Sequence, residues 1–376
     1  PRRPQISLFG STTNPLQSSY DDTFSFFESS PIKDRTSAGI LVEQLLFDFF
    51  STKYQIDEAR NNLLAEDVVL QQKVNSLILK MITSCLDTAS YKILNLMVDD
   101  SVNRHREITE KIAIRVQSGR APTRELSRAN ARLAEAEAKL LRIQLSYDSA
   151  KAKFIQLMPN IKVCDQMIGF NQSMLIIESN EAKKLAISSN LNIKEIDLRI
   201  KAAEENVSKQ RASFWPKLNL RIQGDIYNPD YFMTKKLEEH DIYLGVQFES
   251  EIYTGGRKNS QLRIAKQRLN QLSYDRSTLT KDITANIESL LSELKSANDR
   301  IKTYEKAFNA NGTSRENLNM QFQTSNVSLL DLLQAERDFL ESAENMVFNQ
   351  RAVLLSGFTQ MAILGQLKDD VETLGN

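Results

Sequence analysis

The sequence is poor in the residues that build catalytic and metal centres. Its 376 residues include two cysteines, two histidines and one tryptophan. The histidines, His105 and His240, have no cysteine or carboxylate at a metal-ligand spacing, so we interpret them as surface or packing residues. We find no glycine-rich phosphate loop and no catalytic constellation. The sequence therefore predicts a protein that is not an enzyme and that holds neither metal nor cofactor.

The two cysteines, Cys85 and Cys164, lie in different sequence contexts and do not form a metal-ligand pair. A disulfide between them is one interpretation. We favour two separate buried thiols, because a free cysteine behaves as a small hydrophobic residue.

Charge of one sign and long hydrophobic runs are also lacking. Lys plus Arg and Asp plus Glu both number 48, so no net charge favours nucleic acid or an acidic membrane surface. The absence of a run of about 18 apolar residues argues against a transmembrane helix, whereas barrel strands give a far weaker signal. Only 12 glycines and 8 prolines interrupt the chain, as expected for long helices.

The strongest positive signal is an internal duplication at a constant shift of 206 positions. We therefore divide the chain into a first repeat (1–159), an equatorial connector (160–180) and a second repeat (181–376). The shift aligns Leu46–Arg60 with Ile252–Lys266. Identical residues at this shift include Gly39 and Gly245, Gln55 and Gln261, Ala59 and Ala265, Gln117 and Gln323, Leu126 and Leu332, and Ala129 and Ala335.

Each repeat is predicted to contain one β-hairpin followed by one long helical hairpin. Alternating apolar residues predict the β-hairpins over about 3–46 and 215–252. Apolar steps of 3 and 4 predict the helical hairpins over about 51–158 and 257–364, before a C-terminal tail. A further helix is predicted over about 181–213. By symmetry we expect a similar helix before the first hairpin, in an N-terminal segment of about thirty to fifty residues.

A sharp turn is predicted where a strand gives way to a helix in each repeat. Gly255 and Gly256 allow the backbone to turn sharply in the second repeat, and the shift aligns Phe49 and Phe50 of the first repeat with them. Two aromatic residues there are expected either to anchor at a membrane interface or to pack below the sheet.

Two hairpins supply four strands, and four strands cannot close a barrel. An open edge in lipid would leave backbone groups unsatisfied, at several kcal/mol each. Two copies would give eight strands around a filled interior, and three copies give twelve, the first multiple that leaves a lumen. We therefore expect a trimer that encloses a conduit.

Three stretches of the second repeat resemble the TolC-like outer-membrane efflux family: Trp215–Leu218 (WPKL), Ile252–Arg257 (IYTGGR) and Leu329–Ala335 (LLDLLQA). The resemblance implies an α+β membrane protein, a homotrimer with a twelve-stranded β-barrel in the Gram-negative outer membrane. A long α-helical barrel would continue it across the periplasm. The implied function is the exit duct of a tripartite efflux pump or a type I secretion system. Its implied partners are a periplasmic adaptor (membrane fusion protein) and an inner-membrane transporter.

The resemblance also implies a gate at the periplasmic end, where the best-known member carries acidic rings. Asp331 falls on the first ring position, and Gln334 stands where a second acid would be. Phe322 replaces an aromatic residue that makes a closing link, and Glu125 keeps an acid in the first repeat. We expect a single acidic ring. The alternative for Asp331 is a solvated or capping acid near a helix start.

The tips of the two helical hairpins are the positions at which family members meet the adaptor. Gly119 is the one residue retained from the family's Val-Gly pairs. The expected docking residues are Ser118, Gly119, Arg120, Thr324, Ser325 and Asn326.

Two other functions would also explain long helices. A soluble coiled-coil scaffold would not need paired alternating strands with proline at their entrances. A periplasmic adaptor has a helical hairpin, but its strands would form compact lipoyl-like or small-barrel domains and would not be duplicated in register.

Overall fold

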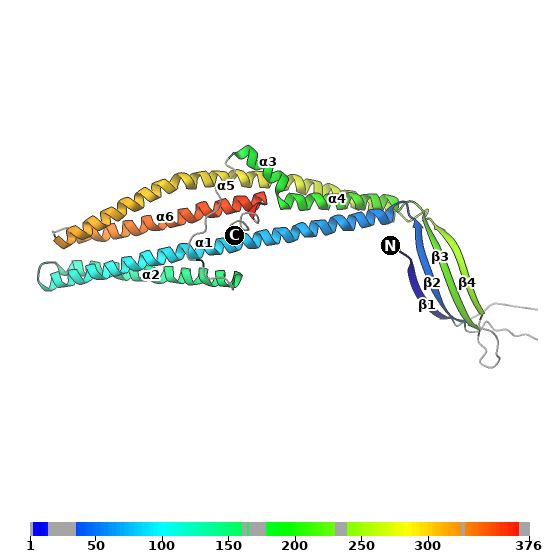
Figure 1. Cartoon of the computed structure of the whole chain (residues 1–376), viewed down its shortest axis with the longest axis horizontal. Coiled ribbons are helices and arrows are strands. Elements are labelled where there is room, and N and C mark those ends of the chain that lie inside the picture. Colours follow the sequence, from blue (N-terminus) through cyan, green and yellow to red (C-terminus); the bar gives the residue numbers. More distant parts are fainter. Residues whose placement is uncertain are drawn as a thin grey trace, which may run out of the picture. The chain divides into compact units, whose positions relative to one another are not determined.

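The computed structural model describes residues 3–13, 35–159, 164, 178–229, 239–324 and 328–367. Most of the predicted connector, 160–180, and the C-terminal tail after 367 lie outside these residues. The elements in chain order are strands β1 (Gln5–Thr13) and β2 (Arg35–Phe47), helices α1 (Ser51–Gln117), α2 (Thr123–Leu157), α3 (Ser179–Ser189) and α4 (Leu191–Ala212), strands β3 (Lys217–Pro229) and β4 (Glu239–Glu249), and helices α5 (Arg257–Thr324) and α6 (Leu329–Leu364) (Figure 1).

The chain divides into two compact units. Unit 1 comprises residues 1–65 and 196–275, which hold the sheet and the adjoining parts of α1, α4 and α5. Unit 2 comprises residues 66–195 and 276–376, which hold α2, α3, α6 and the remaining parts of the longer helices. Each unit therefore takes residues from both sequence repeats.

Unit 1 contains a four-stranded antiparallel sheet in the order β1-β2-β3-β4. Residues directly opposite each other in an antiparallel ladder share a face, so the register sorts the side chains of all four strands. One face is largely apolar, and many of its side chains are solvent-exposed in the single chain. It carries Ile6, Leu8, Ile40, Val42, Leu220, Ile222, Ile226, Ile242, Leu244, Val246 and Phe248.

The other face of the sheet is mostly polar. It includes Glu43 and Arg221, whose charged atoms lie 3.9 Å apart, and Asp225, which accepts hydrogen bonds from Gln223 at 2.9 and 3.0 Å. Gly39 lies opposite Asp225, where a Cβ atom would come within 2.5 Å of the Gly224 carbonyl oxygen. A residue without a side chain is therefore required at position 39.

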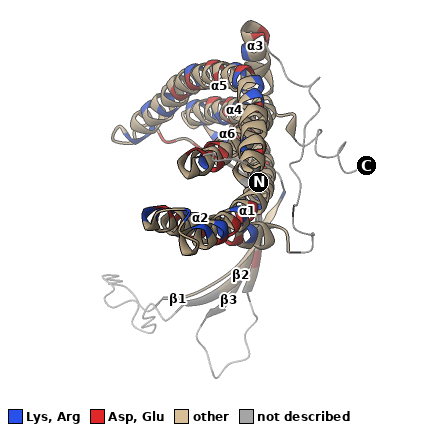
Figure 2. Cartoon of the chain, turned by 90° about the vertical axis from the view of Figure 1, so that its left-hand side faces the viewer, with Lys and Arg blue, Asp and Glu red and all other residues tan. Residues whose placement is uncertain are grey.

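The long helices form hairpins with narrow apolar seams. On α2 the buried residues Ala129, Ala136, Ile143 and Ala150 recur every seven positions. This is the period of a left-handed supercoil, and the alanines allow a neighbouring helix to approach closely. Within the described residues, no helix has both the length and the apolar composition that a bilayer crossing requires. Basic and acidic residues are distributed over all the helices (Figure 2).

Two helices, α3 and α4, take the place of the single helix predicted over 181–213. Asn190 separates them, and its side-chain oxygen accepts a hydrogen bond from the Asn192 amide at 2.9 Å, which caps α4. Its Nδ2 donates to the Ile363 carbonyl at 2.9 Å, and the Ser189 hydroxyl donates to the Leu364 carbonyl at 2.7 Å. The break therefore ties this segment to the end of α6.

Cys85 of α1 and Cys164 of the connector form a disulfide, with their Cα atoms 5.2 Å apart. Our interpretation of two separate thiols was wrong. The cysteines are 79 residues apart in sequence, and Cys164 lies beside α1 in the structure. Residue spacing alone does not reveal such proximity.

Candidate functional site

The turn between α1 and α2 contains Ser118, Gly119 and Arg120, all exposed. Gly119 has φ of 71°, its amide donates to the Val116 carbonyl at 3.0 Å, and the Arg120 amide donates to the Arg115 carbonyl at 2.8 Å. This is a Schellman ending, which requires the left-handed conformation that glycine adopts without strain. Three of the six predicted docking residues thus form an ordered, exposed tip.

The corresponding turn of the second hairpin is described only at its edges. Thr324 is the last residue of α5, while Ser325 and Asn326 lie outside the described residues. Helix α6 begins after Ser328, whose hydroxyl oxygen accepts a hydrogen bond from the Leu330 amide at 3.2 Å.

A hydrophobic cluster lies behind the two tips, and we call it the tip cluster. Phe322, a predicted gate residue, is 1% exposed within it. The Arg115 guanidinium lies 4.4 Å from the centre of the Phe322 ring and donates to the Phe322 carbonyl at 2.9 Å. Phe322 is therefore a core residue that joins the hairpins. The tip cluster consists of Ile108, Ile112, Ala129, Phe322, Leu329, Leu332 and Leu333.

The other predicted gate residues lie near the starts of the two return helices. Asp331 is exposed in the first turn of α6, where its negative charge suits the positive end of the helix dipole. Gln334 donates to the Asp338 carboxylate at 2.7 Å, and Glu125 lies half-buried in the first turn of α2. The exposed position of Asp331 is compatible with the predicted acidic ring, whereas the Gln334 side chain is already hydrogen-bonded within α6.

A cleft of about 640 Å³, which we call the tip cleft, opens between the first turns of α2 and α6. Phe322, Leu329 and Leu333 of the tip cluster form its apolar wall. The cleft brings Glu125, Phe322 and Arg120 together, but Asp331 and Gln334 do not line it. Its charged lining consists of Arg115, Arg120, Arg128, Arg132, Glu125 and Glu135.

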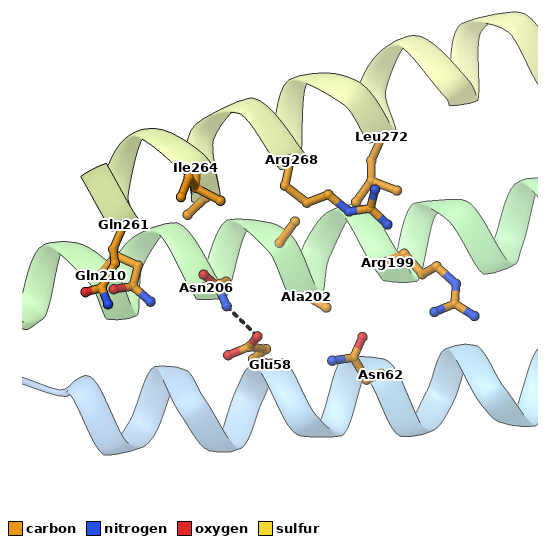
Figure 3. Close-up of a pocket in the computed structure, with 12 residues that line it drawn as sticks. Glu58, Asn62, Arg199, Ala202, Asn206, Gln210, Gln261, Ile264, Arg268 and Leu272 are labelled. Carbon is orange, nitrogen blue, oxygen red and sulfur yellow. Dashed lines mark hydrogen bonds between the residues drawn. The ribbon is translucent and has the colours of Figure 1, made fainter. Parts of the chain in front are cut away.

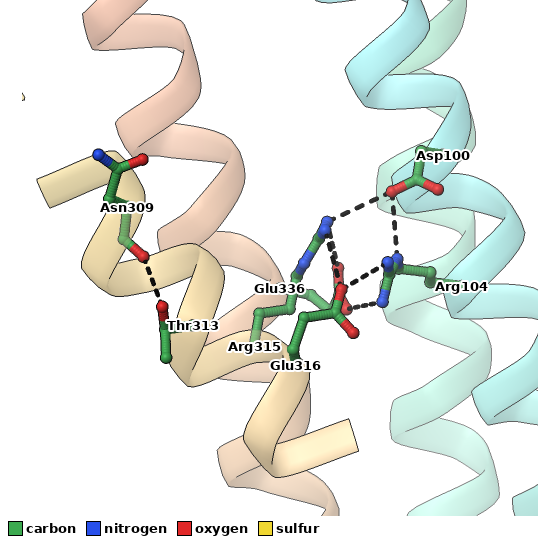
Figure 4. A network of polar contacts seen from close by, with 7 residues as sticks. All are labelled: Asp100, Arg104, Asn309, Thr313, Arg315, Glu316 and Glu336. Carbon is green, nitrogen blue, oxygen red and sulfur yellow. Dashed lines mark hydrogen bonds and ion pairs between the residues drawn. The ribbon is translucent and has the colours of Figure 1, made fainter. Parts of the chain in front are cut away.

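An ion-pair network, which the sequence analysis missed, links α1 to α5 and α6 (Figure 4). Arg104 of α1 donates to Glu316 of α5 at 2.8 Å and to Asp100 at 3.1 Å. Arg315 of α5 lies 3.3 Å from Asp100, so both arginines share that carboxylate. The network therefore joins the first helical hairpin to the second.

Glu336 of α6 is the buried member of this network, with 1% of its side chain exposed. Its oxygens lie 4.0 Å from Arg104 and 3.8 Å from Arg315. Burial raises the pKa of Glu336 to about 7, although the two arginines oppose the shift. One sequence signal was available: Glu336 interrupts an apolar stripe, four residues from Leu332 and four from Leu340.

His105, which follows Arg104, is buried on α1, and among the described residues its Nδ1 has no hydrogen-bond partner. Burial, followed by the positive charge of Arg132, lowers the pKa of this histidine. His240 is exposed on β4. The two histidines are thus one packing residue and one surface residue.

The two strand-to-helix turns of unit 1 have the same backbone conformation despite different residues. Gly255 and Gly256 have φ of 58° and 81°, and Phe49 and Phe50 have φ of 52° and 68°. Left-handed backbone costs a residue with a side chain about 1–2 kcal/mol. Phe49 stacks on Trp215 with ring centres 4.9 Å apart, which favours packing below the sheet as its role.

A second cavity, of about 410 Å³, lies between α1, α4 and α5 in unit 1 (Figure 3). Glu58 of α1 accepts hydrogen bonds from Asn206 at 2.6 Å and from Lys209 at 2.5 Å, both on α4. Ala202 and Ala265 also line it. Because the Glu58 carboxylate is already hydrogen-bonded, we interpret this group as a structural link between α1 and α4.

Residues 183–366, almost all of the second repeat, match the model of a family described as Outer membrane efflux protein. Just under half of the chain is therefore similar to the TolC-like outer-membrane efflux family. This agrees with the resemblance carried by the WPKL, IYTGGR and LLDLLQA stretches, all of which lie inside the matched range.

The relatives of this chain are distant in sequence. It is 19% identical over 335 residues to the outer membrane efflux protein BepC of Brucella suis biovar 1 (strain 1330), covering 89% of this chain and 73% of that protein. The fold matches the outer membrane protein VceC of Vibrio cholerae with a TM-score of 0.82 at 18% identity, over 97% of this chain and 87% of that one. The Campylobacter jejuni CmeC outer membrane channel matches with a TM-score of 0.82 at 14% identity, over 100% and 81%. The description of the matched family places its members in the outer membrane.

Proposed function

We propose that three copies of this outer-membrane efflux protein form the exit duct of a tripartite efflux pump or a type I secretion system. The observation that carries the proposal is the four-stranded sheet with its exposed apolar face. β1 and β4 are the edges of the described sheet, and each leaves backbone groups without a strand partner on one side. In lipid these groups must be paired, and a second copy of the same sheet offers matching edges.

The distribution of side chains sets the orientation that we propose for the sheet. The face with Leu8, Ile222 and Leu244 would meet lipid, and the face with Glu43, Arg221 and Asp225 would line the interior. The strands contain 9 to 13 residues, and a tilted strand needs about 9–11 residues to span a bilayer. Twelve such strands would enclose a water-filled lumen.

The long helices would continue this duct into the periplasm. α1 and α5 contain 67 and 68 residues, which at about 1.5 Å per residue gives each a length of about 100 Å. Side by side in three copies, the hairpins would form an α-helical barrel. Cargo would pass without a catalytic step.

We assign gating and docking to the tips. The exposed Asp331 of each copy would contribute to one acidic ring at the periplasmic aperture, and Gln334 would not add a second. The exposed turn Ser118–Arg120, with Thr324 and its neighbours on the second hairpin, would meet a periplasmic adaptor that recruits an inner-membrane transporter.

Reconstitution into planar bilayers tests this proposal. The purified protein should run as a trimer in detergent and conduct ions. Asp331→Ala should alter conductance or block by divalent cations, because the variant removes the ring charge. Glu341→Ala, an exposed acid farther along α6, is the matched control and should behave as the natural chain. A monomeric, non-conducting protein would refute the duct, and unchanged behaviour of Asp331→Ala would refute the gate assignment.

A further inference from the structure

We propose that the tip cleft receives an acidic, amphipathic helical segment of the protein that docks at this end of the duct. The inference rests on the proposed function, because it assigns a chemical character to the docking partner. It also moves the main contact from the exposed turn to the cleft beside it.

The charge of the cleft is the first support. Arg120 and Arg128 are exposed, and within the described part of the chain neither forms an ion pair. Arg132 pairs with Glu135 at 2.6 Å, and Arg115 donates to the Phe322 carbonyl. Two guanidinium groups therefore remain available at the mouth. Each has the fork geometry that binds a carboxylate through two hydrogen bonds.

The shape and the apolar wall are the second support. A volume of about 640 Å³ lies within the usual range for ligand sites, about 300–1,000 Å³. The wall formed by Phe322, Leu329 and Leu333 would bury apolar side chains, while the arginines would pair with acids beside them. An amphipathic helix in a groove presents this combination of side chains.

The internal duplication supplies the third and independent support. Residues 115–135 contain five arginines and two glutamates, whereas the corresponding residues 321–341 contain one arginine and four acids. The seam residues are nevertheless the same, as Leu126 and Ala129 match Leu332 and Ala335. Helix packing therefore does not require the arginines, since the second hairpin packs without them. We assign them to recognition instead.

An acidic α6 from a neighbouring copy would have the right sign of charge but fewer free groups. Asp338 accepts a hydrogen bond from Gln334, and Glu336 is buried beside Arg104 and Arg315. These two acids are already engaged within their own chain, so a separate partner is the better source of carboxylates.

The test measures peptide binding to the full-length protein in detergent by fluorescence anisotropy. The probe is a labelled alanine-based helix with four glutamates on one face and two leucines beside them. We expect Arg128→Glu to weaken binding at least tenfold. The matched control is Arg124→Glu, an exposed arginine of α2 that does not line the cleft, and it should stay within about twofold. A peptide with glutamine in place of glutamate should bind at least tenfold more weakly, and added salt should weaken the glutamate peptide.

Several results would overturn the inference. These are equal affinity for the glutamate and glutamine peptides, equal losses in Arg128→Glu and Arg124→Glu, or no binding by the natural chain. A lower trimer stability in Arg128→Glu with unchanged peptide binding would also overturn it, and would assign the cleft to a neighbouring copy. If the natural chain still forms a conducting trimer, any of these results would refute only the cleft inference and not the proposed duct function. A monomeric natural chain would refute the duct itself.

Discussion

Replacing Glu336 with glutamine should remove a pH dependence from the stability of the helical unit. Glutamine is nearly isosteric with a protonated glutamic acid and cannot ionise. The residue lies in the buried part of the network that joins α6 to α1 and α5, and Arg104 and Arg315 are the cations that face it. Asp100 and Glu316 are the anions of the same network.

The size of the effect follows from the raised pKa. Glu336 titrates near 4.5 in the unfolded chain and at about 7 in the folded one. Between these values the folded chain holds a proton that unfolding releases, so the free energy of unfolding falls as the pH rises. Below 4.5 both states are protonated, so the free energy of unfolding no longer depends on this group's titration and the contribution is fully present. At about 1.4 kcal/mol per pKa unit, the loss amounts to about 3 kcal/mol by pH 8.

Thermal unfolding of the natural chain and of Glu336→Gln, followed by circular dichroism from pH 5 to pH 8, measures this effect. We expect similar midpoints near pH 5 and a more stable variant at pH 8. For a unit of this size, about 3 kcal/mol corresponds to a difference of about 6–12 °C. Glu341→Gln removes one negative charge from the exposed side of α6 and is the matched control.

Subtracting the two titration series removes the pH effects that the natural chain and the variant share. The reasoning is refuted if the midpoint difference between them stays constant across this range. A natural chain that gains stability relative to the variant as the pH rises would refute it as well, because the sign would be reversed.

Two further predictions concern the sheet and the connector. Gly39→Ala should destabilise the sheet by about 1–3 kcal/mol, because the added Cβ would lie 2.5 Å from the Gly224 carbonyl oxygen. Gly245→Ala is the control, since a Cβ atom there meets nothing within 4 Å, and equal thermal midpoints for the two variants would contradict the prediction. Cys85→Ser should lower the free energy of unfolding by about 2–4 kcal/mol by opening the 79-residue link to Cys164, and a reductant should lower the natural chain's midpoint without affecting the variant's.

The element order of both repeats was predictable because the periodicity that marks strands and helices is local. The fixed shift also predicted a strand-to-helix turn at Phe49 and Phe50, although phenylalanine is a poor turn residue. The left-handed backbone at these positions agrees with Gly255 and Gly256 and not with the residues' own preference. Aligning the two repeats was therefore more informative here than local propensity.

The contacts between hairpins could not be predicted in the same way. The Arg104–Glu316 pair depends on which residues of separate helices lie side by side, and a repeating seam allows several such alignments. The disulfide depends on where Cys164, which is outside any helix, lies along α1. Phe322 was named as a gate residue by resemblance alone, because it stands where a family member has an aromatic closing link. Its burial in the tip cluster depends on contacts between helices that are far apart in sequence. Glu336 was also missed at the sequence level, although a carboxyl group in an apolar stripe is a sequence signal for a buried polar contact.

The opposite charges of the two tip segments limit the symmetry of any docked assembly. Three copies arranged around an axis would display six tips in two alternating kinds, one rich in arginine and one rich in acids. A partner composed of six identical subunits would therefore meet two chemically different surroundings in turn. Its subunits would bind in two conformations or with two affinities, so that the complete complex would keep threefold rather than sixfold symmetry.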